Sequence, residues 1–505
     1  MNLNYLPEIG GGIGMRKLSF TLVGIIVVLF LSSTLFASGV ALTGIGARAT
    51  VMGGNYRAVS DDWSAMYWNP AGITQIEGMH FGVSFELIKP VANYLFNQNA
   101  TMPFSVYRTS EMENESRTFP VPAGGFVYGT GKMAFGISVF APFGLGAKWD
   151  VMNTAGYHSA YPEIEYEDDL QIIDIHPSFA LKLNDKLSVG LGASIVYSDI
   201  IIRKPNITPN PVIFDPNYAE LKGALSLFNL GALAGETYNH VLTETELTGD
   251  GLGFGFNFGL KYDLTEGLSV GLSGFYYNDI PLDGKISAVT YGAEANPALY
   301  AGLEGLTDYL ISNKKLDEAG KQQLLALYDG EKHVRYLQKE GDADLPLPMT
   351  LGLGLAYKGI EKLLVTADVS WTQWSSWDVI KIEMTDGTSE LVENWEDAIR
   401  FGLGLEYKLT ELLALRAGYY TEPSAIPDET LSITIPDPNR RHAISLGLGY
   451  SLGKFQLGAS YERILIGDRE VSSWNYNAPA QGFDNMAGTY KMSVDNVMFG
   501  LGYNF

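Results

Sequence analysis

From residue 79 onward, large apolar residues and small or polar residues occupy alternate positions in segment after segment of the chain. Residues 187–198, LSVGLGASIVYS, place Leu187, Val189, Leu191, Ala193, Ile195 and Tyr197 on one parity and Ser188, Gly190, Gly192, Ser194 and Ser198 on the other. A period of two predicts a β-strand with two unlike faces. The same alternation recurs in residues 133–140, 253–262, 350–358, 400–408, 444–451 and 497–505. We therefore predict an all-β chain beyond residue 79.

The small-residue face separates two β architectures. A soluble sandwich also alternates, but its outer face carries charged and long polar side chains. Here the second face is often glycine or serine, as in TLGLGLAYK at residues 350–358, which suits something packed closely against it. Large residues facing outward with small or polar residues facing inward are typical of an antiparallel transmembrane β-barrel.

The connections between strands give independent support. We predict about fourteen strands, starting near residues 79, 120, 133, 171, 187, 250, 267, 349, 362, 397, 411, 441, 453 and 490. Six connections are tight, at residues 130–132, 184–186, 263–266, 358–361, 408–411 and 451–453. Seven are long, near residues 89–118, 142–170, 204–249, 281–348, 374–396, 421–440 and 466–489. This strict alternation is typical of a bacterial outer-membrane barrel, which has short periplasmic turns and long outer loops.

Residues 1–37 have the features of a secretory signal. The basic start at residues 15–17, MRK, is followed by an apolar run, and Ala37 precedes the predicted cleavage point. Residues 1–14 are then an upstream extension or the product of a start codon assigned too early. The alternative is a retained membrane anchor, because the apolar run is just long enough to span a bilayer. We favour cleavage, since no basic stop-transfer cluster follows.

Composition excludes several functions. The chain has 57 acidic residues against 34 basic ones, for a net charge of −23, and so lacks the basic surface that nucleic acid needs. It has no cysteine, which removes disulfides, thiol catalysis and cysteine-ligated metals. Its six histidines form no hydrolase motif or metal-ligand pair, and its GxG repeats open no βαβ unit. We predict no enzymatic activity, no cofactor and no metal.

Two polar clusters come closest to a catalytic or metal site. Asp174, His176 and Ser178 share a parity and are predicted to face the lumen, where a Ser/His/acid set is conceivable although polar residues are expected there in any case. Residues 165–169, EYEDD, have acids but lack the ligand spacing of a calcium loop. We predict that this second cluster is solvated loop.

One long loop, residues 281–348, has helical character. Apolar residues recur at spacings of three and four in residues 296–337, first at Leu303, Leu306 and Leu310 and again at Leu324, Leu325 and Tyr328. We predict two short amphipathic helices over the barrel mouth. They either cap the barrel or offer a hydrophobic surface that collects substrate.

Several segments of the chain occur with the order and spacing of a known family. They are GARATVMGGNYRAVSDDWSAMYWNPAG at residues 46–72, HPSFALKLNDKLSVGLG at 176–192, GDGLGFGFNFGLKY at 249–262, LPLPMTLGLG at 345–354, WTQWSSW at 371–377 and IPDPNRRHAISLGLGYSLG at 435–453. With them the chain resembles the FadL/TodX outer-membrane transporters, which take up long-chain fatty acids and other hydrophobic compounds. The resemblance implies a 14-stranded barrel, residues 79–505, closed by a small N-terminal hatch, residues 38–78.

The hatch contains a stretch, AVSDDWSAMYWNPAGITQ at residues 58–75, that follows the period of neither a strand nor a helix. The resemblance implies that Asn69, Pro70 and Ala71 match the family's hatch signature. With Gly72 they are predicted to form the turn that returns the chain to the first strand.

The same stretch supplies a candidate substrate pocket. We predict that the floor of an apolar pocket is formed by Trp63, Met66, Tyr67 and Trp68. Two hatch cations, Arg48 and Arg57, either meet a substrate carboxylate or neutralise the acids Asp61 and Asp62. We favour the internal pairing, because a lone cation in the lumen is costly.

The third strand contains a candidate lateral gap. In ISVFAPFGLGAKW, Pro142 removes a ladder donor, and Gly144 and Gly146 soften the strand. The segment is either a gap in the wall or an ordinary strand end that enters a loop. The route we predict is capture of a fatty acid or similar hydrophobic ligand by the outer loops, passage to a lumen pocket, and exit through this gap into outer-membrane lipid.

The end of the chain agrees with this location. The last strand finishes on Phe505 and resembles the terminal signal that outer-membrane assembly machinery reads. Two other functions remain open. A diffusion porin for polar solutes would need no hatch, and an adhesin or receptor would act through its loops alone.

Overall fold

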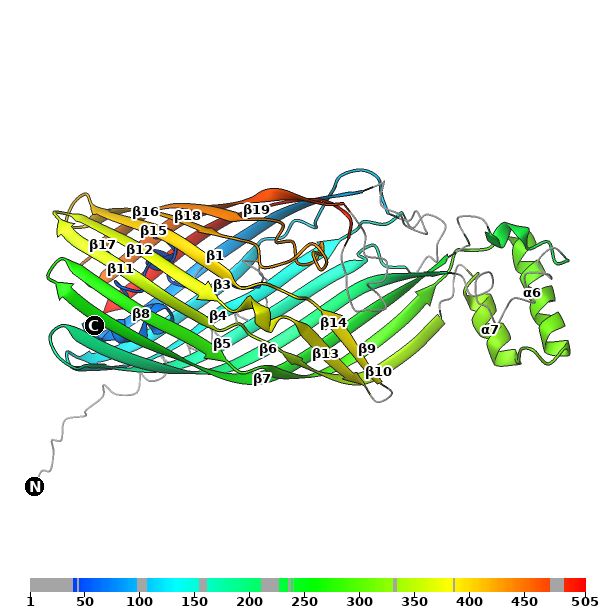
Figure 1. Cartoon of the computed structure of the whole chain (residues 1–505), viewed down its shortest axis with the longest axis horizontal. Helices are drawn as coiled ribbons and strands as arrows, with labels where there is room; N and C mark the ends of the chain where they lie inside the picture. Colours follow the sequence, from blue (N-terminus) through cyan, green and yellow to red (C-terminus); the bar gives the residue numbers. More distant parts are fainter. Residues whose placement is uncertain are drawn as a thin grey trace, which may run out of the picture.

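The computed structural model describes residues 40–42, 45–97, 107–153, 161–209, 227–234, 238, 240–329, 334–384, 387–472 and 486–505. The predicted signal sequence lies outside these residues. The described chain forms one antiparallel barrel, and its first strand pairs with its last (Figure 1). The wall strands are β1 (Glu77–Phe96), β3 (Phe119–Thr130), β4 (Met133–Trp149), β5 (Tyr166–Lys182), β6 (Leu187–Pro209), β7 (His240–Thr265), β8 (Leu268–Tyr277), β11 (Thr350–Ile360), β12 (Leu363–Thr372), β15 (Ala398–Lys408), β16 (Leu413–Glu422), β17 (Arg441–Leu452), β18 (Phe455–Val471) and β19 (Gly488–Asn504).

These fourteen strands confirm the predicted barrel. The ladder that closes it runs from His80 opposite Asn504 to Phe96 opposite Gly488. The strands begin close to the predicted positions, with β7 as the main exception. It begins at His240 rather than near residue 250, because β6 and β7 continue as a paired hairpin up to Pro209 opposite His240.

Shorter elements extend the wall on the side of the long loops. Strand β9 (Ile280–Tyr291) continues β8, β10 (Val334–Leu345) precedes β11, and β13 (Val379–Met384) pairs with β14 (Gly387–Val392). Strand β2 (Met112–Glu113) pairs with β1. A short 3-10 helix, η4 (Trp374–Ser376), links β12 to β13, and η3 (Gly231–Ala234) precedes β7.

Two helices, α6 (Pro297–Ser312) and α7 (Glu318–Ala326), confirm the helical pattern of the longest loop. Their predicted position over the mouth is wrong. They stand at the tip of the β7, β9 and β10 extension, beyond the ends of the strands (Figure 1). There they bury Leu303, Leu306 and Leu310 against Leu230 and Leu233 in a hydrophobic core separate from that of the barrel. Among the described residues, none of the helices has the length and apolar character needed to cross a bilayer.

The two faces of the wall differ as the alternation predicts. On the outer face, Leu191, Phe254 and Leu446 are each about 60% exposed, at 61%, 62% and 61%. The inner face carries glycine, serine and buried polar groups. Inside it lies the hatch, built from α2 (Ala47–Val51), α3 (Ala65–Trp68) and the 3-10 helix η1 (Pro70–Gln75). The wall therefore presents large apolar side chains on its outer face, as a barrel in lipid does, and leaves room for the hatch on its inner face.

Candidate functional site

The glycines of the lumenal face are contact points for the hatch. A Cβ atom built on Gly82 would lie 1.9 Å from Cδ1 of Trp63, and one built on Gly190 would lie 2.4 Å from the backbone of Pro70. The same holds for Gly125 and Gly136 against Met66, Gly259 against Asn69, Gly271 and Gly352 against Arg57, Gly402 against Asn55, and Gly418 against Gly53. The hatch therefore fills the barrel at this level by direct backbone approach, which only glycine permits.

The signature residues Asn69, Pro70, Ala71 and Gly72 shape the hatch and fix it to the wall. The side chain of Asn69 accepts from the Ala71 N–H at 3.2 Å, which caps η1, and donates to the carbonyls of Arg57 at 2.8 Å and Leu260 at 3.0 Å. Pro70 is the first residue of η1. A proline is well tolerated at this position, because the first N–H groups of a helix have no partner within the helix. A Cβ on Gly72 would lie 2.0 Å from the Ser60 carbonyl. These four residues therefore form a turn, and Asn69 anchors that turn to the wall strand β7.

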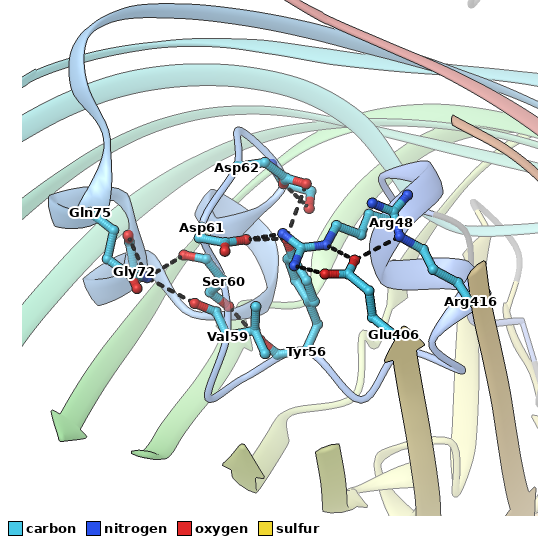
Figure 2. A network of polar contacts seen from close by, with 11 residues as sticks. Arg48, Tyr56, Val59, Ser60, Asp61, Asp62, Gly72, Gln75, Glu406 and Arg416 are labelled. Carbon is cyan, nitrogen blue, oxygen red and sulfur yellow. Dashed lines mark hydrogen bonds and ion pairs between the residues drawn. The ribbon is translucent and has the colours of Figure 1, made fainter. Parts of the chain in front are cut away.

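A polar network holds the hatch at the end of the barrel that carries the short turns. Arg48 lies between Asp61, at 2.5 Å, and Glu406 of β15, at 2.7 Å (Figure 2). Arg416 of β16 binds the same Glu406 carboxylate at 2.7 Å, and Tyr56 donates to Asp61 at 2.7 Å. The network borders a cavity of about 290 Å³. The expected pairing of Arg48 with Asp61 is confirmed.

The second hatch cation pairs differently. Arg57 lies 3.2 Å from Asp368 of β12 and is not bonded to Asp61 or Asp62 among the described contacts. Asp62 instead accepts from the backbone N–H and the hydroxyl of Ser64. The expected pairing of Arg57 with the hatch acids is therefore wrong. Its partner lies 311 residues away in the chain and is set by how the hatch seats against the wall.

Removal of the Arg48 guanidinium should loosen the hatch. Burial alone raises the pKa of Asp61, but the charge of Arg48 and the hydroxyl of Tyr56 lower it below its ordinary value. Because the folded pKa is lowered, this contribution to stability is present at neutral pH and is lost as the pH falls below about 4. We expect Arg48→Ala to cost about 2 kcal/mol, less than a fully buried pair, because the side chain is 21% exposed.

The measurement is the urea midpoint at which chymotrypsin cleaves the hatch of the purified protein, because its aromatic cleavage sites there are the same in every variant. Arg416→Ala is the matched control, since it leaves Arg48 bonded to both acids. Equal midpoints for the two variants would show that Arg48 does not fasten the hatch.

The four residues predicted as a pocket floor have different environments. Trp63 and Met66 pack against glycines of β1, β3 and β4, and Trp68 donates from its indole N–H to the Ile45 carbonyl at 2.8 Å. Tyr67 is only half-buried, whereas the other three are buried, and it meets the aromatic groups above the hatch. Binding of substrate by these residues stays a prediction, and Tyr67 is the best placed for it.

A column of aromatic rings leads away from Tyr67 through the lumen. Tyr67 lies 5.2 Å from Phe140 and 5.6 Å from Phe275, measured between ring centroids. The contacts continue through Phe275–Tyr277, Tyr277–Phe143, Phe143–Trp374, Trp374–Trp395 and Trp395–Trp377. Such rings supply a large apolar surface to a hydrophobic ligand. Sequence reasoning missed this column, although the WTQWSSW motif contains two of its members.

The predicted Ser/His/acid grouping is partly wrong. His176 lies 2.9 Å from the hydroxyl of Ser194, not Ser178, and that hydroxyl donates to Asp174 at 2.8 Å. The other ring nitrogen lies 3.1 Å from the Asn257 side chain, which donates to the Met66 carbonyl at 2.7 Å. All of these wall residues are buried, and the network ties the hatch to β7. Its geometry is that of a structural anchor.

The acids of residues 165–169 also have structural partners. Glu165 accepts the backbone N–H of Val151 at 2.8 Å, and Glu167 pairs with Lys148 at 2.6 Å and Arg203 at 2.9 Å. The segment is therefore buried ion-pair structure joining β4, β5 and β6, not the solvated loop that was expected.

Strand β4 separates from β3 at its midpoint. The two strands pair from Gly129 opposite Ala134 only as far as Gly124 opposite Val139. The β4–β5 register shifts between Phe140 and Phe143. Before this point the side chains alternate between exposed and buried, whereas afterwards nearly every residue to the end of β4 is buried. The second half of β4 is therefore covered on both faces while it stays paired with β5, and Pro142, Gly144 and Gly146 lie on this half.

Residues 40–42 of the hatch take the place beside β4 that β3 leaves. The Leu42 N–H donates to the Pro142 carbonyl at 2.9 Å, and the Gly144 N–H donates to the Val40 carbonyl at 2.7 Å. Ala41 is thereby bridged to Phe143. The start of the described chain thus covers the inner edge of the break between β3 and β4.

Strand β3 contributes two prolines to this break that sequence reasoning missed. Pro120 and Pro122 share a parity, and β3 keeps an unbroken ladder with β1 through both. Their missing N–H groups must therefore face the other neighbour, β4, since a proline facing β1 would interrupt that ladder. The spacing FPVP within a predicted strand was the available signal.

Comparisons with known proteins find relatives of this chain along nearly its whole length. Residues 28–505 match the family model described as outer membrane protein transport protein (OMPP1/FadL/TodX). The long-chain fatty acid transport protein of Escherichia coli O6:H1 is 24% identical over 454 residues, covering 89% of each chain. Outer membrane protein P1 of Haemophilus influenzae is 26% identical over 380 residues, covering 71% of each.

Two solved structures share the fold. A Pseudomonas aeruginosa FadL homologue has a TM-score of 0.68 and 18% identity, covering 92% of this chain and all of its own. The Pseudomonas putida toluene transporter TodX has a TM-score of 0.62 and 17% identity, covering 92% of this chain and 99% of its own.

Proposed function

Since the chain belongs to the OMPP1/FadL/TodX family of outer-membrane transport proteins, we propose that it carries a long-chain fatty acid or similar compound to the lumen and releases it sideways between β3 and β4. The coarse function follows from the family, whose members are non-enzymatic outer-membrane transporters of hydrophobic compounds. The route and the ligand are the proposal. The separation of β4 from β3 beyond Val139 is the observation that carries it.

Transfer energies favour a sideways exit. Burial of an acyl chain contributes about 0.8 kcal/mol per methylene, so a chain of roughly sixteen carbons gains about 12 kcal/mol on leaving water. Release into periplasmic water would cost that amount again, whereas release into lipid would cost little. The aromatic column offers the ligand an apolar surface, and Phe143 lies both in that column and at the break. On this route the ligand would stay in contact with apolar groups from the lumen to the membrane.

The hatch argues against a diffusion porin. At several lumenal glycines the backbone of the hatch lies directly against the backbone of the wall. An aqueous channel for polar solutes would need this part of the lumen to be open. A receptor that acts through its loops alone predicts no uptake of hydrophobic compounds, so an uptake measurement separates it from a transporter.

Filling the break should reduce transport. Pro142→Val with Gly144→Val adds a donor and two branched side chains where β4 is bent. We expect uptake of labelled oleate by whole cells to fall about tenfold, because the apolar exit narrows. Phe135→Leu with Ile137→Val is the matched control, since these residues lie on the half of β4 that is paired with β3. Unchanged uptake at equal surface expression would refute exit at this position.

A further inference from the structure

Two buried carboxylates lie on the lumenal face of the wall, at the seam where β1 pairs with β19. Glu86 of β1 is 1% exposed and shares the parity of Gly82, which faces the hatch, and Glu462 of β18 is 2% exposed. Strand β19 runs between them, with Asn496 directly opposite Glu462 and Met498, the next inward residue, directly opposite Glu86. Neither acid belongs to the hatch network or to the proposed route.

The carboxylate of Glu86 needs a positive partner. Neither of its oxygens has a hydrogen-bond partner among the described residues. An isolated carboxylate away from water is strongly destabilising, so buried charges in proteins are paired or bind a metal ion. Glu462 is also close enough for its charge to act on Glu86, which adds repulsion to this cost. The seam is therefore incomplete as a purely protein structure.

Two neutral oxygens beside Glu86 lack partners as well. The amide nitrogen of Asn496 donates to Glu462 at 3.1 Å, which fixes the orientation of the amide and places Oδ1 on its other side, toward β1. This oxygen is buried, and within the described chain nothing donates to it. The same holds for the hydroxyl of Ser84, one inward position from Glu86 on β1. Residues at such diagonal positions of an antiparallel pair are within reach of long side chains.

Oxygen ligands of this kind fit a calcium ion. Ca²⁺ takes about six to eight oxygens in flexible geometry, whereas Mg²⁺ demands a near-ideal octahedron and keeps several waters, for which a buried patch has little room. Glu462 can contribute, because its two oxygens accept one hydrogen bond each, from Ser445 and Asn496, and each keeps a second lone pair. Two carboxylates also balance the charge of a divalent ion.

Neutral ligands are essential to such a site. In the part of the chain that the structure describes, no group of three or more His, Cys, Asp or Glu side chains is placed to hold a metal. An ion at the seam would therefore draw on two acids together with amide and hydroxyl oxygens, which are accepted calcium ligands when the acids supply the charge.

A polar cavity reaches the seam from the side of the short turns. The cavity of about 290 Å³ beside Arg48 is lined by Gly500 of β19, which lies directly opposite Ser84. The same glycine packs against the hatch, since a Cβ atom built on it would lie 2.7 Å from Cβ of Ala47 in α2. The cluster thus lies between an entry path for a small ion and the part of the wall on which α2 rests.

We propose that the seam holds one Ca²⁺ ion. Its ligands are the carboxylates of Glu86 and Glu462, the amide oxygen of Asn496 and the hydroxyl oxygen of Ser84. The ion ties the first strand to the last two, beside α2, and its role is structural and independent of the transported ligand. The proposal departs from the sequence prediction of no metal, because these ligands come from opposite ends of the chain and share no motif.

The test is equilibrium dialysis of the purified full-length protein, stripped with EDTA, against radiolabelled Ca²⁺. We expect one ion per chain with a dissociation constant of about 0.1–1 mM. Glu86→Gln keeps the shape of the side chain and removes its charge, so it should weaken binding about tenfold or more. Ser84→Ala removes one neutral ligand and should weaken binding less. Glu77→Gln, at an exposed acid of the same strand, is the matched control and should bind as the wild type does.

The unfolding temperature, read from heat-modifiable migration on gels, gives a second measurement. Ca²⁺ should raise it in the wild type and in Glu77→Gln and should have no effect in Glu86→Gln, because a ligand stabilises only the fold that binds it. Absence of saturable binding by the wild type would overturn the site and leave Glu86 as a protonated acid. Equal binding and an equal temperature shift in folded Glu86→Gln would overturn it too.

Discussion

Replacement of Gly82 by leucine should unseat the hatch and turn the barrel into an ion-conducting pore. A Cβ at this position would lie 1.9 Å from Cδ1 of Trp63, and the rest of a leucine side chain would enter the indole. The ring cannot yield, because Trp63 is also held by β3, where a Cβ on Gly125 would lie 3.1 Å from its Cε3. Overpacking usually costs about 1–3 kcal/mol, enough to displace a small insert from a stable barrel.

The measurement is single-channel conductance in planar bilayers. We expect a closed wild type and a Gly82→Leu variant with steady ohmic conductance. Phe85→Leu is the matched control, because Phe85 lies on the lipid-facing side of the same strand with 37% exposure. Heat-modifiable migration on gels verifies that each barrel is folded. A folded variant without conductance would show that the hatch tolerates loss of this contact.

Features of the fold that depend on residues close together in the chain could be predicted from the sequence. Alternation and turn spacing are local, so the strand starts and the six tight turns were predictable. The small lumenal residues also indicated a tightly packed insert, which the contacts of Gly82 and Gly190 bear out. The helices α6 and α7 were visible in their periodicity, but their position was not, because it depends on how far β7, β9 and β10 extend.

Partners across the barrel were beyond sequence reasoning. Arg57 finds Asp368, and His176 finds Ser194 rather than Ser178, because the register between strands and hatch selects neighbours far apart in the chain. The prolines of β3 did give a signal, because their shared parity says that both missing N–H groups face the same neighbouring strand; the ladder with β1 then shows that this neighbour is β4.

A reversible disulfide between the hatch and β4 should have a second large effect, on uptake of the ligand. Ala41 and Phe143 face each other as a pair flanked by hydrogen bonds at residues 40 and 42. In such a non-hydrogen-bonded pair the Cα atoms are about 4.5 Å apart, within the range of a disulfide. The chain has no cysteine, so Ala41→Cys with Phe143→Cys would form one defined bond without competition. It would fix the start of the hatch against the inner edge of the break, where ligand must pass.

The central claim is lateral release between β3 and β4, and this pair tests it most directly. Uptake of labelled oleate is measured in cells that carry the double variant, before and after reduction, with each single cysteine variant as control. We predict that uptake is lost in the oxidised protein and returns on reduction, while reduction leaves the single variants unchanged. Equal uptake in the oxidised and reduced double variant would contradict lateral release at this site.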